Sequence, residues 1–262
     1  MAQLEDLEIP TIGYGTPEIR VLPSPKRLRA FAAGGVQVVD SKRVQLMLEP
    51  GRLPVYYFPK QDVRMDLLTP RRSEDEPGRK GPATLWTLTA GDLVVEDALF
   101  SFEETPENAP ELAGLISMYW SRMERIFEEE EEVFAHARDP AHRIETLRTS
   151  RHIEVMLDGQ TLAETNRGVM LIEPRLPIRY YIPKLDCRFD LLDPSPTTSV
   201  CPYKGFATEY WSASGIRDVA WCYPAPLLEC AQIANLVAFF SEKVEIYVDG
   251  ELLPKLITPW ST

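Results

Sequence analysis

The chain of 262 residues is 44% hydrophobic and 10% aromatic, and its formal net charge at neutral pH is −12. This composition supports packed cores in one or two domains and differs from that of a disordered chain. The acidic balance argues against a protein that grips the phosphate backbone, so no nucleic-acid partner is expected. No apolar run reaches the length of a membrane span, and the acidic start differs from a signal peptide. We therefore expect a cytoplasmic protein without membrane association.

The chain is organised as a tandem repeat. At an offset of 124 residues, 10 of the 15 positions from Tyr56 to Pro70 are identical to their partners from Tyr180 to Pro194. A match of this length at constant offset is not expected by chance. We predict a Pro- and Gly-rich extended arm over residues 1–26, a first repeat over 27–128 and a second repeat over 151–249. An acidic helical linker over 129–150 joins the repeats, and a tail covers 250–262.

Each repeat is predicted to contain strands first and one helix last. In the second repeat, Ile153, Val155 and Leu157 alternate along a strand that Asp158-Gly159 ends in a tight turn. Apolar residues later follow the spacing of one helix face, at Ile233, Leu236, Val237, Phe240 and Val244, and earlier at Leu112, Leu115, Ile116, Tyr119 and Met123. The predicted fold is therefore mainly β (α+β). It has two tandem antiparallel β-sheet domains, each closed by one C-terminal amphipathic helix.

A set of short motifs in the second repeat carries a family resemblance. These motifs are Ile172-Glu173-Pro174, Tyr180-Tyr181-Ile182-Pro183, Arg188-Phe189-Asp190-Leu191-Leu192, Cys201-Pro202-Tyr203-Lys204-Gly205 and Trp221-Cys222-Tyr223-Pro224. The chain resembles the domain of unknown function 427 family, here in two tandem copies. The resemblance implies a β-tent-like arrangement, similar to that of methionine-R-sulfoxide reductases and the ligand-binding domain of cereblon, and it implies no established activity. The first repeat departs from the pattern, because Pro77-Gly78-Arg79 stands in place of Cys201-Pro202-Tyr203.

The motifs of nucleotidyl transfer and metal binding are missing from the sequence. The family is sometimes placed under a nucleotidyltransferase heading, but the chain lacks a Gly-Ser followed by paired aspartates and lacks a G-x-x-x-x-G-K-[ST] loop. The four cysteines, at positions 187, 201, 222 and 230, include no C-x-x-C pair and are not grouped with the histidines. We therefore predict no metal and no other cofactor.

The leading functional hypothesis is a small polar or aromatic ligand bound in an aromatic-lined pocket of the second repeat. Such pockets combine apolar walls with a few polar anchors. The candidate ligand-binding residues are Glu173, Tyr180, Tyr181, Arg188, Asp190, Tyr203, Lys204, Trp211, Trp221 and Tyr223. In the alternative interpretation the aromatic residues form core, and ion pairs such as Arg188 with Asp190 support the shared fold. The first repeat would be a degenerate copy kept for packing.

Two other functions are compatible with the sequence. In the first, Cys201 is a catalytic nucleophile or redox thiol, and Lys204 lowers its pKa if the turn at Pro202 brings the two together. In the second, a groove between the repeats receives a peptide or a modified side chain, which would give the chain a protein partner. The segment from Pro70 to Lys80 mixes both charge signs and is predicted to be a solvated loop.

Overall fold

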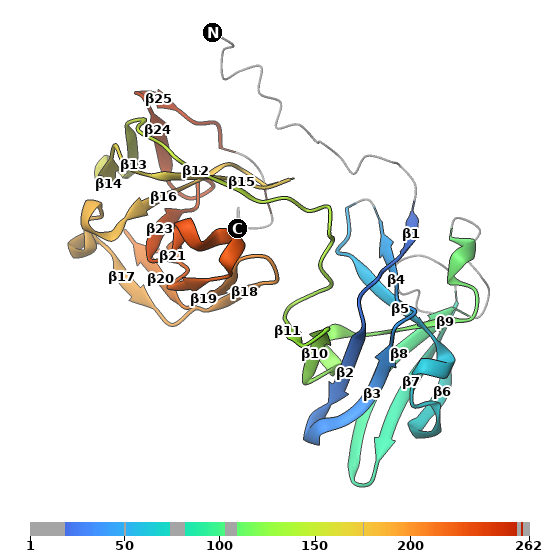
Figure 1. Cartoon of the computed structure of the whole chain (residues 1–262). Coiled ribbons are helices and arrows are strands. Elements are labelled where there is room, and N and C mark those ends of the chain that lie inside the picture. The colour runs from blue at the N-terminus through green and yellow to red at the C-terminus, as the bar shows by residue number, and fades with distance from the viewer. Residues whose placement is uncertain are drawn as a thin grey trace. The chain divides into compact units, whose positions relative to one another are not determined.

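The computed structural model describes residues 19–49, 51–73, 82–102, 109–174, 176–255 and residue 258. These residues fall into two compact units, whose boundary in the sequence lies between Asp139 and Pro140 (Figure 1). The first 18 residues of the predicted arm, and the predicted loop from residue 74 to its end at residue 80, lie outside the described residues. Within the described ranges, no helix combines the length and the hydrophobicity needed to cross a membrane.

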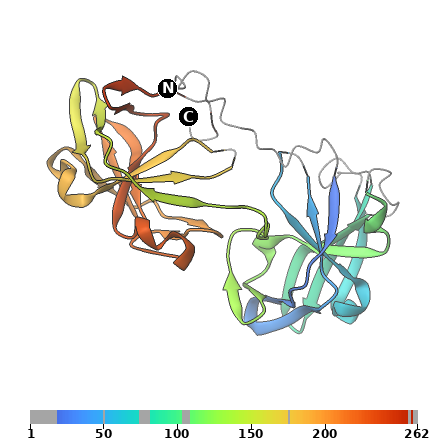
Figure 2. The ribbon, with the colours of Figure 1, turned by 45° about the horizontal axis from the view of Figure 1, so that its top comes forward.

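The first unit contains two antiparallel sheets. Its seven-stranded sheet pairs in the order β1 (Arg20–Pro23), β4 (Gln45–Leu48), β5 (Val55–Pro59), β9 (Leu115–Met118), β8 (Leu93–Phe102), β7 (Ala83–Ala90) and β6 (Leu68–Ser73). Its four-stranded sheet pairs in the order β11 (Glu131–Val133), β10 (Arg125–Glu128), β2 (Leu28–Ala32) and β3 (Val36–Ser41). Strands β7 and β8 form a long antiparallel hairpin (Figure 2). The register of this hairpin shifts between Trp86 and Leu88.

The second unit repeats this strand order. Its seven-stranded sheet pairs in the order β12 (Glu145–Arg148), β15 (Val169–Ile172), β16 (Arg179–Pro183), β23 (Leu236–Phe239), β21 (Ile216–Cys222), β20 (Glu209–Ala213) and β17 (Asp193–Ser195). Its four-stranded sheet pairs in the order β14 (Gln160–Thr165), β13 (Ile153–Leu157), β24 (Glu245–Val248) and β25 (Glu251–Leu252). A small third sheet consists of β18 (Ser199–Cys201), β19 (Gly205–Ala207) and β22 (Ala225–Pro226). The predicted mainly β, antiparallel fold is confirmed.

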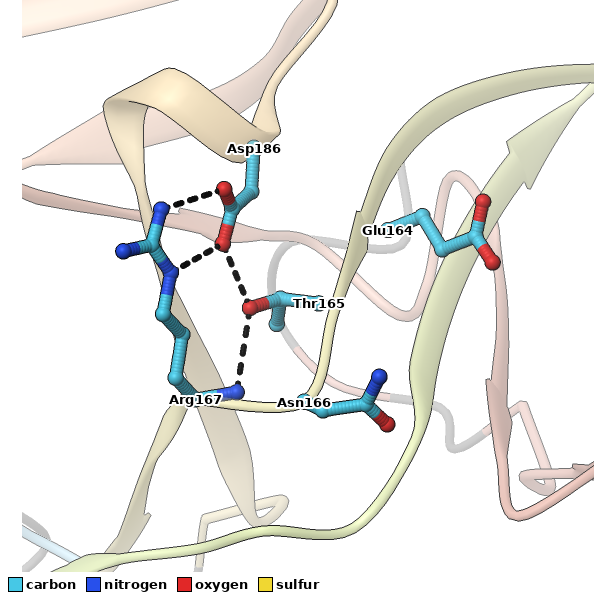
Figure 3. A pocket seen from close by; sticks show the side chains of 5 residues that line it. All are labelled: Glu164, Thr165, Asn166, Arg167 and Asp186. Atoms are coloured by element: carbon cyan, nitrogen blue, oxygen red, sulfur yellow. Dashed lines mark hydrogen bonds and ion pairs between the residues drawn. The ribbon is translucent and has the colours of Figure 1, made fainter.

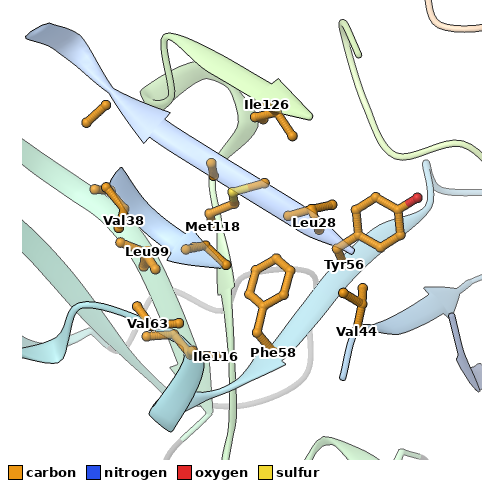
Figure 4. Packing of buried hydrophobic residues seen from close by; sticks show 14 of the residues in the cluster. Leu28, Val38, Val44, Tyr56, Phe58, Val63, Leu99, Ile116, Met118 and Ile126 are labelled. Carbon is orange, nitrogen blue, oxygen red and sulfur yellow. The ribbon is translucent and has the colours of Figure 1, made fainter. Parts of the chain in front are cut away.

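The central strands of each seven-stranded sheet, β5 and β9 in the first unit and β16 and β23 in the second, are buried on both faces. In the first unit, Leu28, Val38 and Ile126 of the smaller sheet share a core with Phe58, Leu99 and Ile116 of the larger sheet (Figure 4). A second cluster, which includes Met47, Tyr57, Leu85 and Phe100, forms separately from this core. Neighbouring residues of one strand contribute to different clusters, because successive side chains point to opposite faces. A strand covered on both faces, such as β5 or β23, is therefore almost continuously apolar.

The predicted closing helices are wrong. Each apolar stripe that predicted a helix contains a central strand instead, β23 in the second unit and β9 in the first. The turns that precede these strands, η9 (Leu228–Ile233) and η5 (Pro110–Leu112), are short 3-10 segments. Strand β23 pairs with β16 and β21, and its residues are apolar because both of its faces are covered. A short run of this kind matches the spacing of a helix stripe by its apolar content alone. Asn235, with a φ of 60°, ends the turn before β23.

The predicted acidic linker helix is also wrong. Strands β10 and β11 form an antiparallel hairpin whose turn begins at Glu129. Glu129 has a φ of 52°, which lies in the left-handed region. The acidic side chains are balanced across strands, since Glu130 pairs with Arg29 at 2.9 Å and Glu132 pairs with Arg125 at 3.0 Å. Three further strands lie in segments that were predicted to have no strand. They are β12 in the predicted linker, β1 in the predicted arm and β25 in the predicted tail.

The remaining 3-10 turns are η2 (Ala33–Gly35), η3 (Lys60–Asp62), η4 (Met65–Leu67), η6 (Trp120–Arg122), η7 (Lys184–Asp186) and η8 (Phe189–Leu191). Among them, η3 and η7 lie at equivalent places in the two units, as do η4 and η8, whereas η2 and η6 occur in the first unit. The turns η3 and η7 are tied to the smaller sheets by the isolated bridges Val39 with Val63 and Ala163 with Cys187. This role explains why the sequence around η3 is so similar to that around η7.

Candidate functional site

A buried polar site in the second unit begins at the turn between β18 and β19. Cys201 and Gly205 are cross-strand partners, and Pro202, Tyr203 and Lys204 form the turn between them. Gly205 has a φ of 94°, and a Cβ atom there would lie 3.4 Å from the backbone nitrogen of Leu227, so this position favours glycine. The same nitrogen donates to the carbonyl of Lys204 at 3.0 Å. The turn is thereby fixed with the Lys204 side chain only 10% exposed.

Three ionisable side chains from distant segments meet at this turn. The Lys204 ammonium donates a hydrogen bond to Oε2 of Glu173, which follows β15. Oε1 of the same carboxylate lies 3.0 Å from Nε2 of His142, which precedes β12. The Glu173 and His142 side chains are 6% and 17% exposed. The site is therefore assembled by the fold and cannot be seen as a local sequence motif.

The ion pair stays charged although it is buried. Burial raises the pKa of Glu173, but the hydrogen bond from His142 and the charge of Lys204 outweigh burial and hold that pKa below its ordinary value. Burial lowers the pKa of Lys204, but the charge of Glu173 and nearby groups outweigh it and raise that pKa. Because an ionised carboxylate only accepts, His142 donates its Nε2 proton to Glu173. In the neutral ring, Nδ1 is then an acceptor.

The Lys204 ammonium has donors left over. An ammonium carries three N–H donors, and among the residues that the structure describes its one hydrogen-bond partner is Glu173. Tyr203 stacks on His142 with ring centroids 4.1 Å apart and an interplanar angle of 20°. Both rings are partly exposed. The arrangement therefore presents a buried cation, with two N–H donors that no described residue accepts, beside a pair of stacked rings.

Two thiols border the site. The Cys230 thiol is fully buried, and its sulfur lies 3.7 Å from the carbonyl oxygen of Tyr203. Burial raises the pKa of Cys230 to about 11, and it raises the pKa values of Cys187 and Cys222 to about 12. Cys201 is partly exposed, and it lies near enough to Lys204 to contribute to the raised pKa of that ammonium. The two residues predicted as a catalytic pair are thus neighbours.

Comparison with known families agrees with this repeated architecture. Residues 20–129 and residues 145–250 each match the family described as Domain of unknown function (DUF427). The chain belongs to this family. Its two DUF427 copies stand in tandem, as the motif pattern predicted. No curated protein matches the chain.

The second DUF427 repeat divides the predicted aromatic residues between two clusters. Tyr181, Trp221 and Tyr223 pack together with Cys230, and Glu173 is close enough to contribute to the raised pKa values of both tyrosines. Tyr180 and Trp211 instead pack in the core between the two sheets. The structure therefore does not bring all of these aromatic residues together, and a ligand pocket in this repeat stays a prediction. The physical reason is the alternation of the strand, which sends the adjacent residues Tyr180 and Tyr181 to opposite faces.

The predicted polar anchors Arg188 and Asp190 lie on the surface. Their side chains are 58% and 60% exposed and form an ion pair at 2.6 Å. The first DUF427 repeat has the same pair, between Arg64 and Asp66 at 2.7 Å. The alternative prediction, an ion pair that belongs to the shared fold, is confirmed for these residues.

An open depression of about 380 Å³ lies elsewhere on the second repeat, lined by Glu164, Thr165, Asn166, Arg167 and Asp186 (Figure 3). The Thr165 hydroxyl donates to Asp186 at 2.6 Å, and Arg167 binds the same carboxylate through Nε and Nη2. In the first repeat, Ser41 and Arg43 bind Asp62 in the same way. These contacts tie η7 and η3 to the smaller sheets, so we assign them to the fold.

His142 is the site residue that sequence reasoning missed. The sequence gives no local signal for it, because its partners Glu173 and Tyr203 lie 31 and 61 positions further along the chain. Another histidine of the second repeat, His152, pairs with Glu164 at 2.8 Å. Among the described residues, no three His, Cys, Asp or Glu side chains are grouped as metal ligands would be. The peptide groove between the repeats stays a prediction.

Proposed function

We propose that the second DUF427 repeat binds a small polar ligand whose carboxylate, phosphate or carbonyl oxygen accepts hydrogen bonds from Lys204. The single observation that carries this proposal is the Lys204 ammonium, which is 8% exposed as a residue and keeps two N–H donors without a partner among the described residues. A buried donor that lacks an acceptor costs free energy, and hydrogen bonds to charged groups are the stronger ones. A ligand oxygen would recover that cost.

The surroundings of Lys204 support recognition of a polar ligand. Glu173 keeps the ammonium charged, and His142 adds a ring nitrogen that can accept a proton or a hydrogen bond. Tyr203 and His142 form a partly exposed stacked pair beside the ammonium. Apolar walls with a few convergent polar groups are typical of ligand sites. The cluster of Tyr181, Trp221 and Tyr223 supplies such a wall near Glu173.

The test is a thermal-shift and NMR screen of carboxylates, phosphates, nucleotides and modified amino acids on the whole chain. A ligand at a hundredfold excess over its dissociation constant should stabilise the folded state by about 2.7 kcal/mol. The double variant Glu173→Gln/Lys204→Met removes both charges, keeps similar side-chain volumes, and is expected to fold without binding. Lys184→Met is the matched control, because Lys184 also pairs with a glutamate, Glu209, outside the site.

Two results would count against ligand binding at Lys204. The first is a screen in which no compound shifts the melting temperature of the wild-type chain. The second is a ligand whose shift survives in Glu173→Gln/Lys204→Met, since its binding would not need the ion pair. A ligand that the double variant loses and Lys184→Met retains would support the proposal.

A second candidate function is thiol chemistry at Cys201, and the proximity of Lys204 favours it. A thiolate is the reactive form of cysteine and is stabilised by a nearby ammonium. The other three thiols have raised pKa values through burial, so they remain protonated at neutral pH. Iodoacetamide at pH 7 should therefore alkylate Cys201 before the other three thiols, and Glu173→Gln/Lys204→Met, which removes the ammonium without leaving an unpaired buried charge, should slow that reaction. Equal rates at Cys201 in both proteins would show that Lys204 does not activate the thiol.

A further inference from the structure

The outer face of the smaller sheet in the first repeat carries its own arginines. Phe127 of β10 has two guanidinium groups over its ring, and the central carbons of Arg29 and Arg125 lie 5.2 and 4.7 Å from the ring centroid. The same arginines pair with Glu130 at 2.9 Å and with Glu132 at 3.0 Å. The cations of this face therefore cover an aromatic ring and also neutralise two carboxylates of the same sheet.

The second repeat has carboxylates in place of both arginines. Tyr247 of β24 is the counterpart of Phe127, because it pairs with Glu154 of β13 as Phe127 pairs with Arg29 of β2. By the same register, Glu245 stands two residues before Tyr247, at the position of the second arginine. The ring in the second repeat is therefore flanked by two negative charges, where the ring in the first repeat is flanked by two positive ones.

This surface of the second repeat, which we call the acidic face, is open to solvent. It consists of Glu154, Met156, Glu245, Tyr247 and Leu252, which replaces Glu132 in the strand register. All five side chains are at least partly exposed, and Leu252 is 53% exposed. Glu154 accepts a hydrogen bond from Thr161 at 3.0 Å, and neither glutamate of the acidic face has an ion pair within the described part of the chain. The charges are thus accessible and lack a cation of their own.

We propose that the acidic face docks an arginine-bearing segment of a protein partner. Charge complementarity selects a basic partner, and the first repeat shows where guanidinium groups lie on the equivalent face. Arginine fits better than lysine, because a guanidinium stacks on an aromatic ring and binds a carboxylate through two parallel donors. Met156 and Leu252 supply apolar contacts beside Tyr247, and tyrosine and arginine are common anchors of protein interfaces.

The spacing of the two glutamates suits an extended segment. Glu154 and Glu245 are diagonal neighbours on β13 and β24, and such neighbours lie about 7–8 Å apart. Side chains at alternate positions of an extended chain are about 6.4–6.8 Å apart and point to the same side. Two arginines separated by one residue can therefore reach both carboxylates at once. The acidic face does not include Lys204, so this docking is independent of the ligand proposed for that residue.

The test is a titration of the whole chain with the peptide acetyl-Arg-Val-Arg-amide, followed by two-dimensional NMR. Shifts should be confined to β13, β24 and β25, and acetyl-Lys-Val-Lys-amide should bind several-fold more weakly. Glu154→Arg/Glu245→Arg should abolish binding, and it should fold because the first repeat has arginines at both positions. Asp193→Arg/Glu229→Arg is the matched control, since it changes the charge equally at two exposed residues outside the acidic face, and it should retain binding.

Further arms keep the test decisive. Tyr247→Leu should weaken peptide binding several-fold, and Glu173→Gln/Lys204→Met should leave it unchanged. If Glu154→Arg/Glu245→Arg fails to fold by NMR, Glu154→Gln/Glu245→Gln replaces it, because the amides keep the shape and lack the charge. The absence of binding, binding that the double variant retains, equal loss in the matched control, or equal affinity for both peptides would overturn the proposal. Self-association that only the change of Glu154 and Glu245 abolishes would assign the face to a second copy of this chain, and would also overturn it.

Discussion

The two repeats share their strands but bury their charges in different places. In the first repeat, Glu128 at the end of β10 is 3% exposed and accepts hydrogen bonds from Tyr56, Lys26 and Arg138. The counterpart of Glu128 in the second repeat is Val248, which belongs to the hydrophobic core. The comparison teaches that apolar packing, which both repeats keep, is sufficient to determine the backbone fold. The positions of buried charged residues can therefore differ between the two repeats.

The second repeat in turn has two buried ion pairs of its own. The first is Lys204 with Glu173, and the second is Arg179 with Glu242, whose side chains are 8% and 0% exposed and 2.7 Å apart. The Arg179 guanidinium also lies over the rings of Trp221 and Phe240. In the first repeat, Val55 stands in place of Arg179, and the counterpart of Glu173 is Glu49, which lies 3.5 Å from Arg52. Buried pairs add little net stability over apolar packing, so this difference directs attention to function in the second repeat.

The largest expected effect comes from separating the buried pair of the second repeat. Lys204→Met leaves Glu173 buried without its cation, and the loss of one partner of a buried pair typically costs about 3–5 kcal/mol. The double variant Glu173→Gln/Lys204→Met leaves no unpaired charge, so its loss should be much smaller. Glu49→Gln in the first repeat should also be mild. Hydrogen exchange measured by mass spectrometry separates the two repeats, and equal destabilisation by the single and double variants would show that the pair is not coupled.

The next largest effect is the loss of folding stability as the pH falls. The pKa of Glu173 is lowered in the folded state, so its contribution to stability is present above the ordinary pKa of 4.5 and is lost as pH falls through the lowered value. Glu128 has a lowered pKa for the same kind of reason, with burial opposed by Lys26, Tyr56 and Arg138. Both repeats should therefore lose stability between pH 5 and more acidic values. Urea unfolding at several pH values in this range measures how steeply the free energy of unfolding depends on pH. In Glu173→Gln/Lys204→Met, this pH dependence should become weaker for the second repeat and should remain unchanged for the first.

A smaller effect is the difference in stability cost between removing the hydroxyl of Tyr56 and removing that of Tyr180, which stand at equivalent positions in the two repeats. The Tyr56 hydroxyl donates to Glu128 at 2.7 Å in a buried site, and a hydrogen bond to a charged group is worth about 1.5–3 kcal/mol. Tyr56→Phe should therefore destabilise the first repeat by that amount. Tyr180→Phe is the matched control, because Val248 stands where the first repeat has Glu128, and it should cost less than Tyr56→Phe. Equal losses in urea unfolding would contradict the assigned role of Glu128.

Sequence reasoning reached the repeat, the β architecture and the family, because each depends on local patterns. The identities between Tyr56 and Pro70 and their partners encode the turns η3 and η7, which both repeats build from the same ion pairs. The closing helices failed because a strand buried on both faces, such as β23, has the apolar content of a helix stripe. The linker helix failed because a left-handed residue at Glu129 begins a turn inside the acidic run.

The candidate site could be predicted only in part. Glu173, Tyr203 and Lys204 stood out through the motifs that contain them, whereas His142 joins them through the tertiary fold alone. The separation of Tyr180 from Tyr181, and of Tyr210 from Trp211, follows from strand alternation and could have been deduced. The ion pair of Arg188 with Asp190 was one of two interpretations open from the sequence, and the structure places it on the surface.

The smallest expected effect concerns the surface pairs that the repeats share. Arg64→Ala and Arg188→Ala each remove one partner of an exposed ion pair that joins residues two positions apart. Exposed pairs of this kind contribute little, because water and salt screen the charges. Neither change should move the urea midpoint measurably, and Arg188→Ala should leave ligand binding at Lys204 unaltered. A loss of binding in Arg188→Ala alone, with Arg64→Ala silent, would extend the functional site of the second repeat to η8 and would restore Arg188 as a ligand anchor.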